Sequence, residues 1–244
     1  MNIVELEAEL VRVGKESTHC GRRCEGVESP VKEGSFPRNA MISGSGDKIG
    51  CVIVSLAPPK VSVRDQKAFA AARSHEEALK QCRSRVESSA LHSKLDAFRS
   101  ELGLEGSSVW TILCKCGRIK GEKLPFETMQ ACAESYLAKE LELVDKSVPI
   151  IALGNRVFNA VRQNFADRFV LNVPSPDGSQ SDFQKTMDNK KLLGFARARI
   201  AEGKPGALCL CPPCARRYLP ELKTRIHARF PILWASGFSP LSLC

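Results

Sequence analysis

The chain has 244 residues, of which 43% are hydrophobic and 26% charged, a composition that suits one large globular domain with a sizeable core. Its net charge of +9 favours an anionic partner, and eleven cysteines without an export signal favour metal or redox chemistry over disulfides. No apolar run approaches the roughly 20 residues of a membrane-spanning helix, so we exclude a membrane partner and expect a cytoplasmic protein.

The first half of the chain predicts a helix followed by two strands. Apolar residues recur at helical spacing over residues 1–14, ahead of a cysteine pair. The apolar run 49–57, stopped by two prolines, predicts a buried strand that ends in a rigid turn. Helical and polar residues fill 64–102, and a second strand is expected at 109–116, where it ends in Cys-Lys-Cys.

The second half alternates helices and strands. A helix is expected from Pro125 to Val144, a strand at 148–153, a helix at 154–165 and a strand at 168–173. Such alternation predicts a parallel sheet with helices on both faces. We therefore expect an α/β fold with three α/β/α layers around a central four-stranded parallel sheet, and ligands at the carboxyl ends of its strands.

The positive charge is concentrated near the end of the chain. From Lys185 to Arg229 there are eleven Lys or Arg residues against three acidic residues. This excess favours contact with nucleic-acid phosphates, although a solvated basic face would have the same composition. We expect residues 1–195 to form the α/β domain and residues 196–244 a basic, cysteine-containing extension packed on it.

Four sequence features follow one another in a distinctive order. They are a helix leading to Cys20 and Cys24, a strand ending in Lys115-Cys116, a Cys132 that comes after fifteen intervening residues and is followed by Tyr136-Leu137, and an apolar strand ending in Ala-Leu-Gly at position 154. In this order the chain resembles the iron-sulfur branch of the uracil-DNA glycosylase superfamily, over roughly residues 1–195. The resemblance implies the glycosylase fold and a DNA-directed activity.

The resemblance also implies a [4Fe-4S] cluster held by Cys20, Cys24, Cys116 and Cys132. Four thiolates are what such a cluster requires, and zinc is the alternative because four thiolates also bind it well. Cys114 competes with Cys116, and only one of the two is expected to reach the metal.

A further cysteine set, Cys209, Cys211 and Cys214, also has metal-like spacing. Three thiolates need a fourth ligand, for which the candidates are His227, Cys244 and Cys82. Structural thiols without a metal are the other interpretation.

The active-site motifs depart from those of the glycosylase family. After the first strand the family commonly has a motif that shapes the pocket, and here Leu56, Ala57 and Pro58 occupy it. On the second strand Ile112 stands where the family usually carries an Asn that contacts uracil. We expect these residues to bind a substrate base other than uracil.

The last family motif usually contains a histidine, which this chain lacks between Val173 and Gly178. Asp177, assisted by Ser175, is the catalytic candidate because a carboxylate can stabilise the sugar cation formed when a glycosidic bond breaks. The other interpretation of Asp177 is a simple Asp-Gly turn. Further contacts are expected from Ser179 and Gln180 to the substrate, and from Lys185, Lys190 and Lys191 to DNA.

Together these features predict a monomeric DNA glycosylase that flips and hydrolyses a modified base, such as a modified cytosine in foreign phage DNA. The alternatives are a uracil-DNA glycosylase of base excision repair and a catalytically inactive iron-sulfur protein that binds DNA. A metal-binding interaction protein without a nucleic-acid role is a third possibility.

Overall fold

The computed structural model describes most of the chain between its first residue and Ala215. The described residues are 1–18, 20, 22, 24–28, 40–56, 71–72, 74–119 and 122–215. They form an α/β fold, as the alternation of strands and helices predicts.

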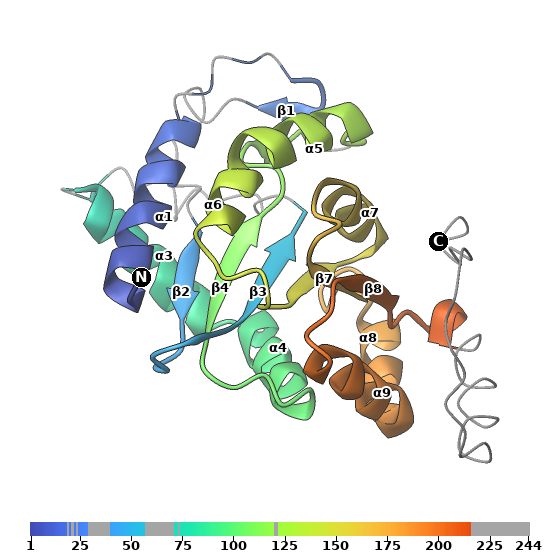
Figure 1. Ribbon diagram of the computed structural model, residues 1–244. Coiled ribbons are helices and arrows are strands. Elements are labelled where there is room, and N and C mark those ends of the chain that lie inside the picture. Colours follow the sequence, from blue (N-terminus) through green and yellow to red (C-terminus); the bar gives the residue numbers. More distant parts are fainter. Residues whose placement is uncertain are drawn as a thin grey trace.

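The central sheet of the described residues has six strands in the order β2-β4-β3-β6-β7-β8 (Figure 1). In chain order these are β2 (Met41–Ser43), β3 (Ile49–Ser55), β4 (Ser107–Ile112), β6 (Ile150–Leu153), β7 (Phe169–Val173) and β8 (Gly206–Cys209). β2 is antiparallel to β4, and the other neighbouring strands are parallel. Because the strand order reverses between β3 and β6, a crevice for ligands is expected at the carboxyl ends of these two strands.

The four expected strands are present as β3, β4, β6 and β7, but the sheet is larger than expected and is mixed. β2 has three residues and β8 has four, too few for an apolar alternation to distinguish them from loops. β8 pairs with β7 along its length, so the sheet includes residues from the segment expected to be a separate extension.

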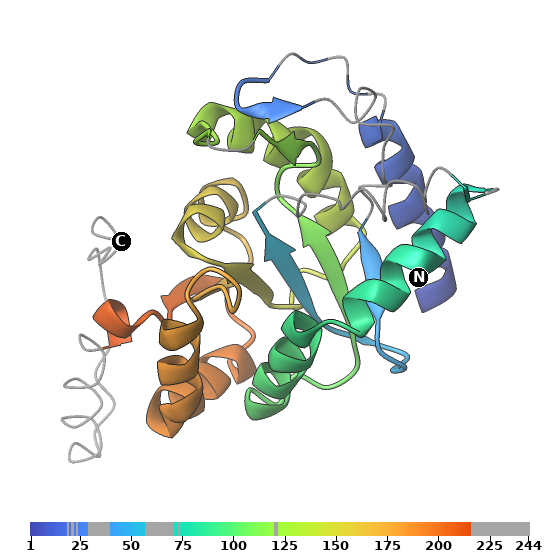
Figure 2. The ribbon, with the colours of Figure 1, turned by 180° about the vertical axis from the view of Figure 1, so that it is seen from behind.

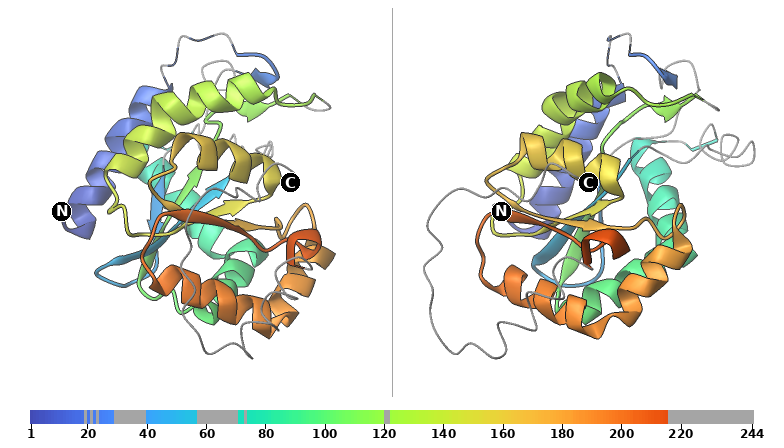
Figure 3. Two further views of the ribbon diagram at one scale, coloured as in Figure 1. Left: turned by 45° about the vertical axis from the view of Figure 1, so that its right-hand side comes forward. Right: turned by 90° about the vertical axis from the view of Figure 1, so that its right-hand side faces the viewer.

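Helices cover both faces of the sheet (Figures 2 and 3). One layer contains α1 (Ile3–Thr18), α5 (Phe126–Cys132), α6 (Ala138–Glu142) and α7 (Asn155–Asn164), with the π-helical segment η1 (Ala133–Leu137) between α5 and α6. The other layer contains α3 (His75–Glu87), α4 (Ala90–Glu101), α8 (Gln180–Asp188) and α9 (Lys190–Ala201). None of the described helices combines the length and apolarity needed to cross a membrane.

Each face of the sheet has its own hydrophobic core. Val52 and Val54 of β3 belong to the core beneath α1 and α7, whereas Cys51 and Ile53 belong to the core beneath α4 and α9. All four side chains are at most 1% exposed. Because successive strand residues point to opposite faces, a strand buried on both sides is continuously apolar.

A second, two-stranded sheet lies near the end of α1. β1 (Val27–Glu28) pairs antiparallel with β5 (Gly117–Arg118). This pairing attaches the segment that follows Cys24 to the segment that follows Cys116, which positions the site described next.

Candidate metal centre

Four cysteines from three separate segments line one pocket beyond the carboxyl end of β4. The residues lining it are Ser17, Cys20, Arg22, Cys24, Lys115, Cys116, Ala131, Cys132 and Tyr136. The structure thus brings together all four cysteines that the sequence predicts as cluster ligands. Arg22 and Lys115 line the same pocket. The pKa of Cys132 is lowered, first by its hydrogen bond with Cys114 and then by Lys115 and Arg22.

Backbone hydrogen bonds position Cys116. After β4 has ended, the N–H groups of Leu113 and Cys114 donate to the carbonyls of Ser55 (2.8 Å) and Leu56 (2.9 Å). The chain therefore stays beside the end of β3 for two more residues before it reaches Cys116.

The loop carrying Cys20 and Cys24 is held at both ends. At its start, the Cys20 N–H donates to the carbonyl of Ser17, near the end of α1 (3.3 Å). Beyond Cys24, the Thr128 hydroxyl of α5 donates to the carbonyl of Glu25 (3.1 Å). The loop is thereby attached to the helix that carries the fourth cysteine of the pocket.

The π-helical segment η1 begins directly after Cys132, which is 7% exposed. Within η1, Tyr136 is hydrogen-bonded to Cys20, and its pKa is raised by burial and then by this contact. π-helical segments often occur at functional sites, where they adjust which side chains point the same way. Here the segment directs Cys132 and Tyr136 into one pocket.

Cys114 is a fifth sulfur at this site. β4 ends at Ile112, so the alternation expected of a strand does not apply to the residues that follow. Cys114 is hydrogen-bonded to Cys132, which lowers the pKa of Cys132 and, together with burial, raises that of Cys114. Cys116 lines the pocket, whereas Cys114 is buried beside it and contacts Cys132 without lining it.

A buried ion pair adjoins the pocket. The Nζ atom of Lys115 lies 2.6 Å from Oε1 of Glu140, and each side chain is 1% exposed. Lys115 also donates to the Thr111 hydroxyl (2.8 Å), which in turn donates to Oε2 of Glu140 (2.6 Å). Glu140 lies on α6, 25 residues after Lys115, so no local sequence pattern predicts that the two side chains pair.

The second cysteine set also converges. The sulfurs of Cys209, Cys211 and Cys214 all lie within 4.8 Å of one another, close enough to bind a metal ion. Of the candidates for a fourth ligand, Cys82 lies on α3, which packs against β2 at the opposite edge of the sheet and so is not a ligand. His227 and Cys244 lie outside the described residues.

The residues expected to bind a substrate lie at the carboxyl ends of three strands. Leu56 follows β3 and Ile112 ends β4, and both are half-buried. Ala57 and Pro58 lie outside the described residues.

The remaining substrate residues lie in the loop that follows β7. Ser175 is half-buried, whereas Asp177, Ser179 and Gln180 are exposed. The Ser179 N–H donates to the Ser175 carbonyl (2.8 Å), closing a turn that leads into α8. The loop therefore presents Asp177 to solvent beside the carboxyl end of β7.

The three expected DNA-binding lysines are spread over two helices. Lys185 pairs with Asp182 on α8 (3.3 Å), and Lys191 is exposed on α9. Lys190 pairs with Glu101 at the end of α4 (2.6 Å), which leads toward the amino end of β4. Lys190 therefore does not lie with the loop that carries Ser175.

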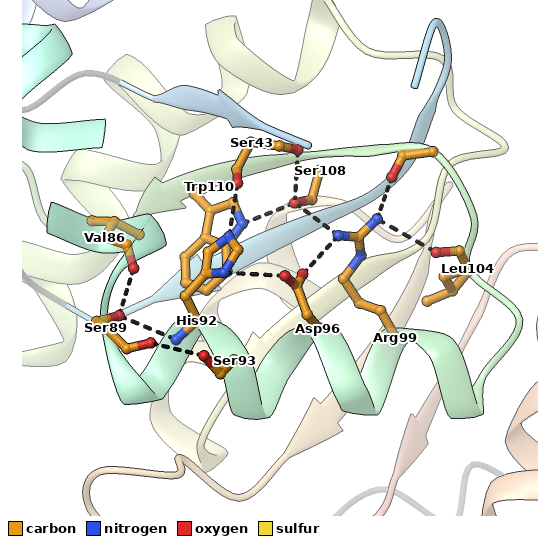
Figure 4. A network of polar contacts seen from close by, with 11 residues as sticks. Ser43, Val86, Ser89, His92, Ser93, Asp96, Arg99, Leu104, Ser108 and Trp110 are labelled. Atoms are coloured by element: carbon orange, nitrogen blue, oxygen red, sulfur yellow. Dashed lines mark hydrogen bonds and ion pairs between the residues drawn. The ribbon is translucent and has the colours of Figure 1, made fainter. Parts of the chain in front are cut away.

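Ser43, His92 and Asp96 form a row with the hydrogen bonds of a serine-hydrolase triad (Figure 4). Nε2 of His92 lies 2.7 Å from the Ser43 hydroxyl, and its Nδ1 lies 3.1 Å from Asp96. Ser43 is only 2% exposed, however, and the His92 ring stacks on Trp110 with centroids 5.1 Å apart. A hydroxyl that solvent cannot reach cannot attack a substrate, so we interpret the row as a structural link between α4 and the sheet.

These features define an α/β protein with a cysteine-lined, metal-type pocket beyond the end of a central strand. No protein-family model matches the chain, and no curated protein matches it either. The geometry of the site is therefore the basis for assigning a function.

Proposed function

We propose that this chain is an iron-sulfur DNA glycosylase that removes a modified base. The observation that carries the proposal is the pocket lined by Cys20, Cys24, Cys116 and Cys132, which come from three distant segments. It supports the resemblance in the order and spacing of these cysteines, because the same four residues are those that the resemblance assigns to the cluster.

The resemblance in the order of the cysteines favours a cluster, and zinc is the alternative. In a four-thiolate zinc site the sulfurs lie roughly 4 Å apart, because each Zn–S bond is about 2.3 Å long. Among the described residues, the one group of three or more ligand atoms within 4.8 Å is that of Cys209, Cys211 and Cys214. No three of the four pocket cysteines form such a group, and in a cluster each thiolate would bind a different iron.

When bound, a [4Fe-4S] cluster would act structurally. It would link the end of α1, the segment after β4 and helix α5, which also share the hydrophobic core on this face of the sheet and are joined by the β1–β5 pair and by hydrogen bonds. The cationic side chains of Arg22 and Lys115 would offset part of the negative charge of the four thiolates.

The carboxyl edge of the sheet supplies groups suited to base excision. Leu56 and Ile112 offer half-buried apolar surface for a flipped base and no polar group that reads the edge of uracil. Asp177 would stabilise the positive charge that develops on the sugar. Ser179, Gln180 and the first N–H groups of α8 would bind the flanking phosphate.

Iron content tests the cofactor. The protein purified without oxygen is expected to be brown and to contain about four iron atoms per chain. Cys116→Ser and Cys132→Ser should lose most of this iron, whereas Cys82→Ser, on α3 and outside the pocket, should retain it. A colourless protein with zinc in the pocket would rule out the cluster.

Base excision tests the activity. The protein is incubated with duplexes containing uracil, damaged bases, and hydroxymethylated or glucosylated cytosine, and abasic sites are then cleaved with alkali. We expect excision of a modified base and its loss in Asp177→Asn, while Asp167→Asn, an exposed carboxylate outside the β7–α8 loop, remains active. Excision of uracil alone would indicate the repair enzyme, and salt-sensitive DNA binding without any excision would indicate the inactive binding protein.

A further inference from the structure

Cys209, Cys211 and Cys214 form a second sulfur cluster at the opposite end of the sheet from β2. Cys209 ends β8, and the other two follow within five residues. Cys209 and Cys214 are buried, Cys211 is half-buried, and all three sulfurs lie within 4.8 Å of one another. The sulfurs of Cys209 and Cys211 are 3.1 Å apart.

The backbone around this cluster is held by the main sheet. The Leu210 N–H donates to the carbonyl of Asn172 on β7 (2.9 Å), and the Leu210 carbonyl accepts from the Thr186 hydroxyl of α8 (3.1 Å). The Ala215 N–H donates to the carbonyl of Cys211 (2.9 Å). The three sulfurs are therefore presented by a fixed loop at the carboxyl edge.

A buried amide supports one of the sulfurs. Nδ2 of Asn172, whose residue is 1% exposed, donates to the sulfur of Cys209 (3.0 Å) and to Oδ1 of Asn155 on α7 (2.6 Å). A neutral thiol is a weak acceptor, whereas a metal-bound thiolate is a good one. Donors of this kind orient the ligands of metal sites, and their loss commonly weakens metal binding 10- to 100-fold.

Cys214 takes part in a disulfide in the structure, whereas Cys209 and Cys211 are free thiols. Reduction by a dithiol transfers two electrons and two protons to this disulfide, yields two thiols and leaves the dithiol oxidised. The complete set of three thiols exists only in that reduced state.

We propose that, once reduced, Cys209, Cys211 and Cys214 bind one zinc ion, which is separate from the metal centre at the end of β4. Each thiol releases its proton to solvent as it binds, and water or one further side chain completes the tetrahedron. The close approach of the sulfurs suits a single ion, because sulfurs bound to one zinc lie roughly 4 Å apart. When a disulfide-forming oxidant takes two electrons from the Cys214 sulfur and its partner sulfur, the S–S bond forms again and the oxidant is reduced. Cys214 is then no longer a ligand and the zinc is released, so the site is redox-sensitive.

Zinc analysis of the full-length protein tests this inference. The protein is purified with a phosphine reductant, and zinc and iron are measured per chain. We expect one zinc that is lost in Cys209→Ser and in Cys211→Ser but retained in Cys82→Ser and Cys116→Ser. Asn172→Ala should release zinc to a chromophoric chelator at a chelator concentration 10- to 100-fold lower than the parent requires.

The unaltered protein provides a second readout, which does not depend on a variant folding. A disulfide-forming oxidant is expected to release the zinc, and a dithiol with added zinc should restore it. A reduced parent without zinc, or equal zinc in Cys209→Ser and Cys82→Ser, would overturn the inference. Neither result bears on the iron-sulfur proposal, because Cys116→Ser tests that site separately.

Discussion

At the scale of single residues, the Lys115–Glu140 pair shows how burial decides how much stability is lost when one member of an ion pair is removed. Its two side chains are 1% exposed, with the charged atoms 2.6 Å apart. Lys139 and Glu16 form a pair of nearly the same length (2.7 Å), but their side chains are 51% and 38% exposed. Removing one member of the buried pair leaves the other charge buried without water or a counter-charge. Removing one member of the exposed pair leaves a charge that water solvates.

We therefore predict that Lys115→Met lowers the free energy of unfolding by about 3–5 kcal/mol. Lys139→Met, the matched control, should lower it by less than about 1 kcal/mol. The double variant Lys115→Met/Glu140→Leu should recover most of the loss, because it removes both buried charges. Urea unfolding measures all three, and equal losses in the two single variants would refute this interpretation of the pair.

The buried thiol of Cys51, at the centre of β3, should make the free energy of unfolding depend on pH. Burial raises its pKa from 9.0 to about 11 in the folded protein. The folded state therefore holds the Cys51 proton more tightly than the unfolded state does. The contribution of this proton to the free energy of unfolding is complete below pH 9 and is lost as the pH rises toward 11. The loss is about 1.4 kcal/mol per pH unit across this interval.

Cys51→Ala removes this titration, so the stability advantage of the parent over the variant should shrink between pH 9 and 10.5. Val52→Ala, the neighbouring position on the other face, serves as the control because valine does not titrate. Its stability difference from the parent should stay constant over the same range. Denaturant unfolding under reducing conditions measures both differences, and a constant difference for Cys51→Ala would contradict the prediction.

At the scale of elements, Arg99 connects α4 to the chain entering β4 (Figure 4). It is 7% exposed and donates to the carbonyls of Leu104 (3.4 Å) and Gly106 (2.5 Å), and to the Ser108 hydroxyl (3.3 Å). His92 of the same helix contacts Ser43 of β2. One helix therefore holds the antiparallel edge strand and its neighbour in place through polar contacts.

We predict that Arg99→Met lowers the free energy of unfolding by about 2–4 kcal/mol, because the buried Leu104 carbonyl and the buried Ser108 hydroxyl lose a donor. Arg99→Lys should restore less than half of this loss, since an ammonium group cannot span the positions that the guanidinium reaches. Arg199→Met, which removes a more exposed pair with Glu202, should change stability by less than about 1 kcal/mol. A similar loss at both arginines, measured by thermal or urea unfolding, would argue against the link.

At the scale of the whole molecule, the two hydrophobic cores and the cysteine-lined pocket involve different parts of the chain. β3, β6 and β7 are buried on both faces, whereas the loop with Cys20 and Cys24 is held by a two-residue strand pair and a few hydrogen bonds. A metal centre in the pocket should therefore matter most for this loop and the end of α1.

We predict that oxidative removal of the metal, followed by chelation, speeds hydrogen exchange at 20–28 and 114–119 while exchange in β6 and β7 stays slow. The midpoint of thermal unfolding should fall by about 2–4 °C for each kcal/mol of lost stabilisation. Mass spectrometry of peptides locates the exchange. Uniform acceleration across the central strands would mean that the metal stabilises the whole fold rather than one edge.

The fold could be predicted from the sequence where an element is long enough to show an apolar run or a helical repeat in its own residues. β3 is recognisable because it is buried on both faces and is therefore apolar at successive positions, and α7 because Val157, Phe158 and Val161 recur on one side. The short strands β2 and β8 were missed, since their placement depends on pairing with β4 and β7 rather than on their own residues.

The same division holds for the candidate sites. The sequence by itself determined the α/β alternation and the concentration of cysteines, because strand and helix periods are properties of neighbouring positions. The four residues expected to meet at one metal came instead from the resemblance to the glycosylase superfamily. Only the tertiary structure decided that Cys114 contacts Cys132, that Lys115 pairs with Glu140, and that Asn172 supports Cys209. These contacts join different elements, and the packing of the layers rather than any local preference sets their distances.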